Sequence, residues 1–205
     1  MKILINRLFR KWRTLLSKIV VAGFIFVLLV SETPLQKHEL QEITMNLIGL
    51  ILVGTATVGR LWCLLFISGY KSENLITVGP YSLCRNPLYG FSFLGMVGVA
   101  LCTASFTLTA VMILIFLLYY PFVIHAEEAK LLLKHPIEYP TYCRLTPRMF
   151  PTFVQFREPE LYEVKPRQFR KRLFDGLGFI WLAGLAITLE DLHEIDMLPA
   201  LLYLY

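Results

Sequence analysis

The 205-residue chain is poor in charged residues, and its few cysteines form no recognisable motif. Charged residues make up 17% of the chain, against about 25% in ordinary soluble domains. Hydrophobic residues reach 56%, which excludes intrinsic disorder and collagen-like repeats. The four cysteines contain no Cys-x-x-Cys pair, so the sequence predicts neither a disulfide framework nor a metal site.

Soluble nucleotide-binding motifs are also missing. No Gly-x-Gly-x-x-Gly sequence follows a strand, and strands do not alternate with helices along the chain. A soluble Rossmann-type enzyme is therefore not expected.

What the chain has instead is a series of long apolar segments. A helix that crosses the hydrocarbon core of a bilayer needs about 20 mostly apolar residues. Residues 91–124 carry no charge and are too many for one span, and the polar residues at 102–107 predict a tight hairpin within them. We therefore expect an all-α, multi-pass integral membrane protein that forms a single domain over residues 1–205. The five predicted spans cover approximately residues 15–34, 45–68, 88–104, 106–124 and 173–189.

The positive charges predict how these spans are oriented. Eighteen of the 20 lysines and arginines lie in residues 1–18, 69–88 and 125–172, which places the N-terminus and these segments in the cytoplasm. No small-x-small cleavage pattern follows the first apolar segment, so a retained anchor is favoured over a cleaved signal peptide. The net charge of +5 then reflects topology and contact with anionic lipid, and nucleic acid is not an expected partner.

Two polar segments would face the cytoplasm, and the first covers residues 69–88. A Gly-Pro turn at 79–80 is followed by Asn-Pro at 86–87, which predicts a helix start at the proline. One interpretation is an ordinary loop with a helix cap. The other is a binding site, because several polar side chains lie close together at the end of a span. Polar side chains cost free energy at that position unless they bind a partner. These side chains are Tyr81, Arg85, Asn86 and Tyr89.

The second polar segment, residues 125–172, begins with two adjacent carboxylates. Glu127 and Glu128 come directly after an apolar run, so at least one of them lies near the membrane interface. A carboxylate there needs a positive partner. That partner is either an arginine of the chain (Arg60, Arg85 or Arg148) or a positively charged ligand, and the residues alone leave both open.

The two segments carry spaced motifs. The first reads Gly-x-Tyr-x-x-x-Arg-Asn-Pro-x-Tyr, formed by Gly79, Tyr81, Arg85, Asn86, Pro87 and Tyr89. The second is formed by Glu127, Glu128, Leu131, His135, Pro136, Tyr139, Tyr142, Pro147 and Arg148. Together they resemble the integral-membrane methyltransferases that use S-adenosylmethionine, namely the isoprenylcysteine carboxyl methyltransferases and the related phospholipid methyltransferases. The resemblance extends over about residues 50–151 and includes Arg60 and Trp62.

The chain departs from the family pattern at two places. The family has histidine where this chain has Asn86, and asparagine forms hydrogen bonds but cannot act as a base near neutral pH. The family's Phe-Gly is His135-Pro136 here, which suggests a different local turn. A role of residue 86 in holding a cofactor survives the first change, whereas a role as a base does not.

The resemblance implies that S-adenosylmethionine binds in an anionic and aromatic cup where the two cytoplasmic segments meet. It implies Arg85, Glu128 and Arg148 as candidate catalytic residues. Candidate cofactor-binding residues are Gly79, Tyr81, Asn86, Pro87, Tyr89, Glu127, Glu128, Tyr139 and Tyr142. One of the two glutamates would bind the amino group of the cofactor.

The expected methyl acceptor is lipophilic and reaches the site from the bilayer. A prenylcysteine-like carboxylate or a thiolate fits better than an amine, because an amine must first lose a proton and no base stands at residue 86. Three alternatives stay open: a membrane reductase of the sterol reductase type that uses NADPH, a phospholipid N-methyltransferase, and a non-catalytic membrane scaffold. The sequence does not indicate an oligomeric state.

Overall fold

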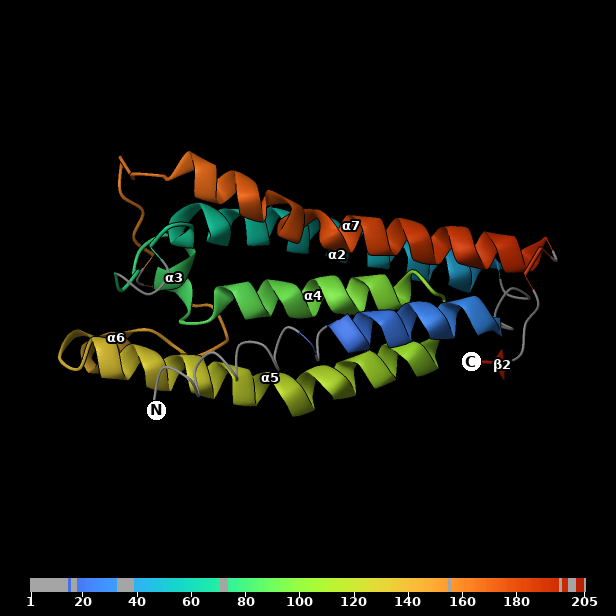
Figure 1. Cartoon of the computed structure of the whole chain (residues 1–205), viewed down its shortest axis with the longest axis horizontal. Coiled ribbons are helices and arrows are strands. Elements are labelled where there is room, and N and C mark those ends of the chain that lie inside the picture. The colour runs from blue at the N-terminus through green and yellow to red at the C-terminus, as the bar shows by residue number, and fades with distance from the viewer. Residues whose placement is uncertain are drawn as a thin grey trace.

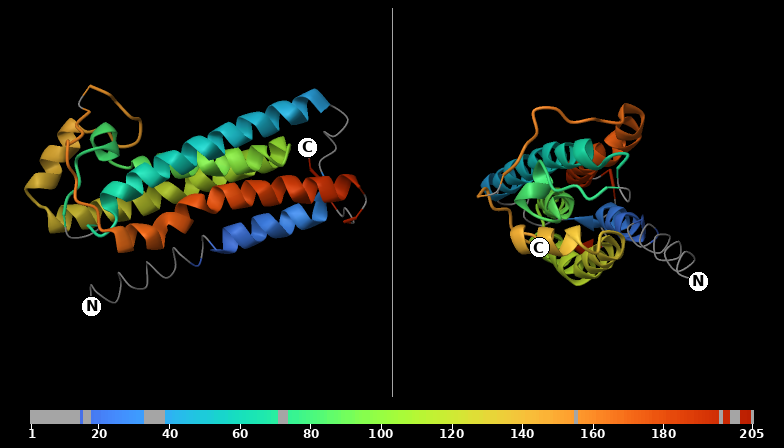
Figure 2. Two further views of the ribbon diagram at one scale, coloured as in Figure 1. Left: turned by 90° about the horizontal axis from the view of Figure 1, so that it is seen from above. Right: turned by 90° about the vertical axis from the view of Figure 1, so that its left-hand side faces the viewer.

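The chain forms a bundle of helices that run along one common direction (Figure 1). The computed structural model describes residues 15, 18–32, 39–70, 74–154, 156–195, 197–198 and 202–204. Its long elements are α2 (Glu39–Ile67), α4 (Pro87–Leu101), α5 (Phe106–Lys134) and α7 (Pro166–Glu194), with a shorter helix over Lys18–Val30. The short helices α3 (Pro80–Leu83) and α6 (Glu138–Leu145) lie together at one end of the bundle (Figure 2). The basic residues before residue 15, which the sequence predicts to lie in the cytoplasm, are outside the described part of the chain.

Strands contribute almost nothing to this architecture. Within the described residues, β1 (Ser31–Glu32) pairs in parallel with β2 (Leu202–Tyr203), with Ser31 opposite Leu202. The pair lies at the end opposite α3 and α6 (Figure 1). The expectation of an all-α fold is confirmed.

Three of the described helices are long and apolar enough to cross a membrane, namely Leu40–Ile67, Phe106–Lys134 and Pro166–Glu194. Many large apolar side chains point outward, as in Phe122 at 72% and Val58 at 70% exposure, which suits contact with lipid. The helices Lys18–Val30 and Pro87–Leu101 are apolar but shorter. At 15 residues α4 is about 22 Å long, less than the roughly 30 Å of a hydrocarbon core. Five spans therefore stay a prediction.

The hairpin predicted at residues 102–107 is present between α4 and α5. Thr103 and Ser105 are fully buried in it, and the Ser105 hydroxyl accepts a hydrogen bond from the backbone N–H of Leu108 at 3.3 Å, which caps α5. α5 continues to Lys134, ten residues past the predicted end of its span, because the charged residues that follow Ile124 are themselves good helix formers. α7 likewise begins at Pro166, seven residues before the predicted span.

Close contact between α2 and α4 depends on two facing glycines. A Cβ atom on Gly49 would lie 2.7 Å from the backbone oxygen of Gly98, and a Cβ on Gly98 would lie 2.7 Å from that of Gly49. Small residues allow helix backbones to approach in this way in membranes, where van der Waals packing drives association. A larger side chain at either position must push the two helices apart.

We expect Gly49→Ala to lower the free energy of unfolding by about 1–3 kcal/mol, the usual cost of overpacking. Gly54→Ala on the same helix is the matched control, because nothing lies within 4 Å of its Cβ position. The control should leave stability within about 1 kcal/mol of the original. Thermal unfolding of the detergent-purified chain measures both, and equal stability of the two variants would contradict the glycine contact.

Candidate functional site

The two motif segments meet at one end of the bundle because α2 and α5 end there and α4 and α7 begin there (Figure 1). Gly79 turns the chain into α3 with a φ of 60°, in the left-handed region that favours glycine. The Phe66 ring lies against it, and a Cβ on Gly79 would be 2.5 Å from that ring. The Gly79 N–H donates to the carbonyl of Arg157 at 2.7 Å, which ties this turn to the chain that follows α6.

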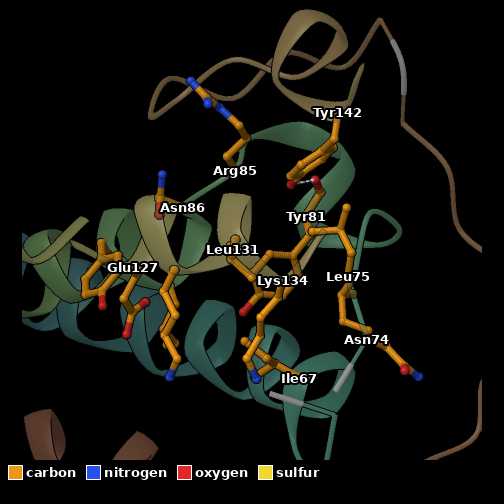
Figure 3. Close-up of a pocket in the computed structure, with 14 residues that line it drawn as sticks. Ile67, Asn74, Leu75, Tyr81, Arg85, Asn86, Glu127, Leu131, Lys134 and Tyr142 are labelled. Atoms are coloured by element: carbon orange, nitrogen blue, oxygen red, sulfur yellow. Dashed lines mark hydrogen bonds between the residues drawn. The ribbon is translucent and has the colours of Figure 1, made fainter. Parts of the chain in front are cut away.

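A cavity lies between the two segments, and its volume is about 820 Å³ when the open solvent at its mouth is included. Figure 3 shows Glu127, Leu131 and Lys134 along α5, with Tyr81 and Tyr142 on the opposite wall. The lining residues are Ile67, Asn74, Leu75, Ile76, Tyr81, Arg85, Asn86, Leu88, Tyr89, Glu127, Lys130, Leu131, Lys134 and Tyr142.

Glu128 joins the two motifs from behind the cavity wall. Its Oε2 lies 3.0 Å from Nη2 of Arg148, and its Oε1 lies 3.5 Å from Nη1 of Arg85. The side-chain amide of Asn86 donates to Oε1 at 3.0 Å. The same amide donates to the backbone oxygen of Arg148 at 3.2 Å. The sequence left open whether a carboxylate here pairs with arginine or with a ligand, and for Glu128 the pairing is with two arginines.

Arg85 clamps α6 and the chain after it to the start of α4. Its Nη1 donates to the Cys143 sulfur at 2.7 Å, and its backbone N–H donates to the carbonyl of Pro147 at 2.8 Å. Burial by itself lowers the pKa of the Arg85 guanidinium, but Glu128 and the Cys143 sulfur outweigh it, so the pKa is raised. Arg85 is thus a fixed positive charge at the site.

Two buried tyrosines form the aromatic wall of the cavity. The Tyr142 hydroxyl donates to the backbone oxygen of Tyr81 at 2.6 Å (Figure 3). The Tyr81 hydroxyl is buried and has no hydrogen-bond partner among the described residues. Burial raises the pKa of both phenols well above the usual value, so both stay neutral at physiological pH and act as hydrogen-bonding and stacking groups, not as bases.

The structure divides the residues singled out in the sequence into two groups. Those that line the cavity are Tyr81, Arg85, Asn86, Tyr89, Glu127 and Tyr142. Those that do not line it are Gly79, Pro87, Glu128, Tyr139 and Arg148. Pro87 is the first residue of α4, and Tyr139 is buried with its ring centroid 6.1 Å from that of Tyr142.

Sequence reasoning missed two lysines on the cavity wall. Lys130 and Lys134 follow Glu127 by three and seven residues, so all three side chains share one face of α5. The sequence would have indicated this face if the helix had been predicted to continue to residue 134. The expected anionic and aromatic cup is therefore corrected: lysines from α5 add positive charge beside Glu127. The loop residues 74–76 were also missed, because their polar and apolar mixture carries no motif.

The segment between α6 and α7 is hydrogen-bonded to the end of α2 and to the loop that follows it, next to the cavity. The Tyr162 hydroxyl donates to the backbone oxygen of Phe66 at 2.7 Å, and Lys165 Nζ donates to that of Gly69 at 3.0 Å. Within the described residues there is no group of three or more His, Cys, Asp or Glu side chains that could hold a metal ion.

The chain matches a family model and known proteins. The phospholipid methyltransferase family model matches residues 45–134, which include the first motif, the hairpin and the start of the second motif. The nickel-cobalt-cadmium resistance protein NccN of Alcaligenes xylosoxydans xylosoxydans is 41% identical over 157 residues, which cover 77% of this chain and 73% of NccN. The cobalt-zinc-cadmium resistance protein CzcN of Cupriavidus metallidurans is 40% identical over 160 residues, covering 77% of this chain and 72% of CzcN.

No solved structure matches the chain. The family of the chain follows from the family model and the two relatives, together with the paired motifs at one end of the bundle. The chain belongs to the phospholipid methyltransferase family.

Proposed function

We propose that the protein transfers a methyl group from S-adenosylmethionine to a lipophilic acceptor in the membrane. The observation that carries the proposal is the meeting of both motif segments at one cavity, in a chain of a methyltransferase family. The enzyme's main task would be to position the two reactants, which can supply about 7–11 kcal/mol of the activation barrier.

The chemistry of the cavity fits S-adenosylmethionine. Glu127 suits its ammonium group, and Lys130 and Lys134 on the same helix face suit its carboxylate. The aromatic wall suits its adenine, and the buried Tyr81 hydroxyl, which has no partner among the described residues, suits a hydrogen bond to its base or ribose. Glu128, Arg85 and Arg148 would act as positioning residues, because their ion pairs hold the two segments in register.

When bound, S-adenosylmethionine supplies a methyl carbon on a positively charged sulfur; the acceptor's lone pair bonds to that carbon, and the carbon–sulfur electron pair stays on sulfur. A carboxylate or thiolate acceptor needs no base for this reaction. Asn86 does not titrate, and the tyrosines of the wall stay neutral, which favours such an acceptor over an amine.

The proposal includes the topology of the chain. Five spans with a cytoplasmic N-terminus would let the soluble cofactor enter from the cytosol while the acceptor arrives from the bilayer. The short helices Lys18–Val30 and Pro87–Leu101 would then require local thinning of the bilayer or shielding by the longer helices. Single cysteines at the exposed positions 106 and 137, introduced into a chain that lacks its four native cysteines, can be labelled with a membrane-impermeant reagent in intact cells. The orientation predicts labelling at residue 106 and protection at residue 137, and the reverse result would contradict it.

Calorimetric titration of the detergent-purified full chain with S-adenosylhomocysteine tests the proposed function. Saturable binding to one site is expected, with NADPH failing to compete. Binding of NADPH without binding of S-adenosylhomocysteine, in detergent and in several lipids, would reverse the assignment in favour of a reductase. Binding of neither would favour a scaffold.

The two relatives are named for resistance to metals, and we propose that methyl transfer by this chain also contributes to metal tolerance. Modification of a membrane component by methylation would be the route by which this chain affects tolerance of nickel, cobalt, zinc or cadmium. Loss of tolerance in a strain whose chain carries Glu127→Gln, at normal protein level, is the expected result.

A further inference from the structure

Large apolar side chains are exposed in the segment that joins α6 to α7. Phe150 is 86% exposed, Phe153 is 76% exposed and Val154 is 91% exposed. The proposed function does not use them, because none of the three is among the described residues that line the cofactor cavity. A group of exposed apolar side chains usually marks a surface that binds a protein or a membrane.

Backbone hydrogen bonds hold this segment beside α3 and the start of α4. The N–H of Arg85 donates to the carbonyl of Pro147 at 2.8 Å, and the N–H of Thr152 donates to the carbonyl of Leu83 at 3.1 Å. The chain that follows α6 thus turns back towards the start of α4 before it reaches α7 (Figure 1). Its depth along the bundle is therefore fixed by the helices next to it.

The helix α2 shows what this depth is. Its apolar part, Leu40–Ile67, has 28 residues and is about 42 Å long, so it extends about 6 Å past each side of a hydrocarbon core of about 30 Å. Trp62 precedes Ile67 by five residues, which places it about 7.5 Å from that helix end. The Phe156 ring lies beside Trp62, with the ring centroids 6.2 Å apart. Phe156 therefore lies at the level where the hydrocarbon core meets the lipid headgroups.

Positive charge accompanies the exposed apolar side chains. Residues 139–157 include three arginines and no aspartate or glutamate. Arg144 and Arg157 are exposed, and the Arg148 side chain is 45% exposed beside its ion pair with Glu128. A membrane surface that carries anionic lipid attracts such residues. A second copy of the chain would bring the same positive charge to the contact and would be repelled.

We propose that residues 144–154 and 156–157 form an interfacial segment that binds anionic phospholipid of the membrane in which the chain lies. Phe150, Phe153 and Val154 enter the boundary between headgroups and acyl chains, and the exposed arginines bind lipid phosphates. The inference goes beyond methyl transfer and does not depend on it. Because Arg85 is bonded to this segment, lipid binding would also hold the wall of the cofactor cavity at the membrane surface.

Fluorescence quenching by lipids tests whether the segment enters the bilayer. Phe150→Cys and Phe153→Cys are made singly in a full chain that lacks its four native cysteines, and each is labelled with a fluorophore and reconstituted into vesicles. Vesicles of phosphatidylcholine and phosphatidylglycerol that include a lipid with a nitroxide at the top of its acyl chain should quench both labels.

Ile137→Cys is the matched control, because Ile137 is 84% exposed and follows α5, which ends about 15 Å past Ile124. Its label should keep its fluorescence in the same vesicles. Labels at 150 and 153 that are not quenched, or quenching equal to that at 137, would overturn the proposal. Self-quenching between labelled copies without quenching by lipid would assign the surface to a second copy instead.

The charge of the segment is tested on the chain with its native cysteines. Native mass spectrometry in a neutral detergent measures binding of short-chain phosphatidylglycerol and of short-chain phosphatidylcholine. Phosphatidylglycerol is expected to bind more tightly, and Arg144→Gln with Arg157→Gln should weaken its binding about fivefold for each arginine removed. Arg144→Lys with Arg157→Lys keeps the charge and should keep most of the affinity. Equal binding of the two lipids, or no effect of the glutamine pair, would overturn the recognition of anionic lipid.

Discussion

Glu127→Gln is expected to lower the affinity for S-adenosylhomocysteine by about 10- to 100-fold and to cost less stability than Glu128→Gln does. Glu127 lines the cofactor cavity, and its neighbour Glu128, which does not line it, is paired with Arg85 and Arg148. The substitution keeps the size of the side chain and removes its charge, so a loss of affinity measures what the carboxylate contributes to binding. Calorimetric titration measures the affinity, and thermal unfolding of the same sample measures the stability.

Glu138→Gln serves as the control for general charge effects at this end of the bundle. Its side chain is 71% exposed and pairs with His135 at 3.4 Å, away from the cavity lining. The control should leave the affinity unchanged. An equal effect of the two substitutions, or no effect of Glu127→Gln, would remove Glu127 from the site.

A different pattern is expected for Glu128→Gln, which should reduce stability and cofactor affinity together. The glutamate is 14% exposed and compensates Arg85, which is 17% exposed. Breaking a fully buried pair costs about 3–5 kcal/mol, and partial exposure reduces this to about 2–3 kcal/mol in the free energy of unfolding. Affinity should fall as well, because Arg85 and Asn86 lose the carboxylate that holds them at the cavity wall.

Replacing the two arginines separately provides an internal check. Arg85→Gln should destabilise the chain more than Arg148→Gln, because the Arg148 side chain is 45% exposed and water can replace much of its ion pair. Denaturant or thermal unfolding in one detergent gives the order. A larger effect of Arg148→Gln, or a Glu128→Gln variant of unchanged stability, would contradict the role of this cluster.

Apolar length and polar interruption were enough to predict the all-helical fold and the hairpin between α4 and α5. The charge-free stretch of residues 91–124 has to turn because it is too long for one span, and its buried polar residues Thr103 and Ser105 stand at that turn. The motifs also predicted which two segments would meet. These features are local in the sequence, so pattern and spacing reveal them.

Helix ends and partners across the bundle could not be predicted in the same way. Hydropathy ends the α5 span at Ile124, but the helix continues to Lys134, because the backbone hydrogen bonds of a helix do not require an apolar side chain. The lysines of the cavity wall were missed for this reason. The contact between Arg60 and Ser92 joins residues 32 apart, and only the packing of α2 against α4 brings them together.

The central claim is that residues 74–89 and 127–142 enclose one cofactor together, and photoaffinity labelling tests it most directly. The purified chain is irradiated with an azido derivative of S-adenosylhomocysteine, digested and mapped by mass spectrometry. Adducts are predicted in both segments, and excess unmodified S-adenosylhomocysteine should suppress them to the same extent. Adducts confined to one segment, or found only outside both, would contradict the shared site.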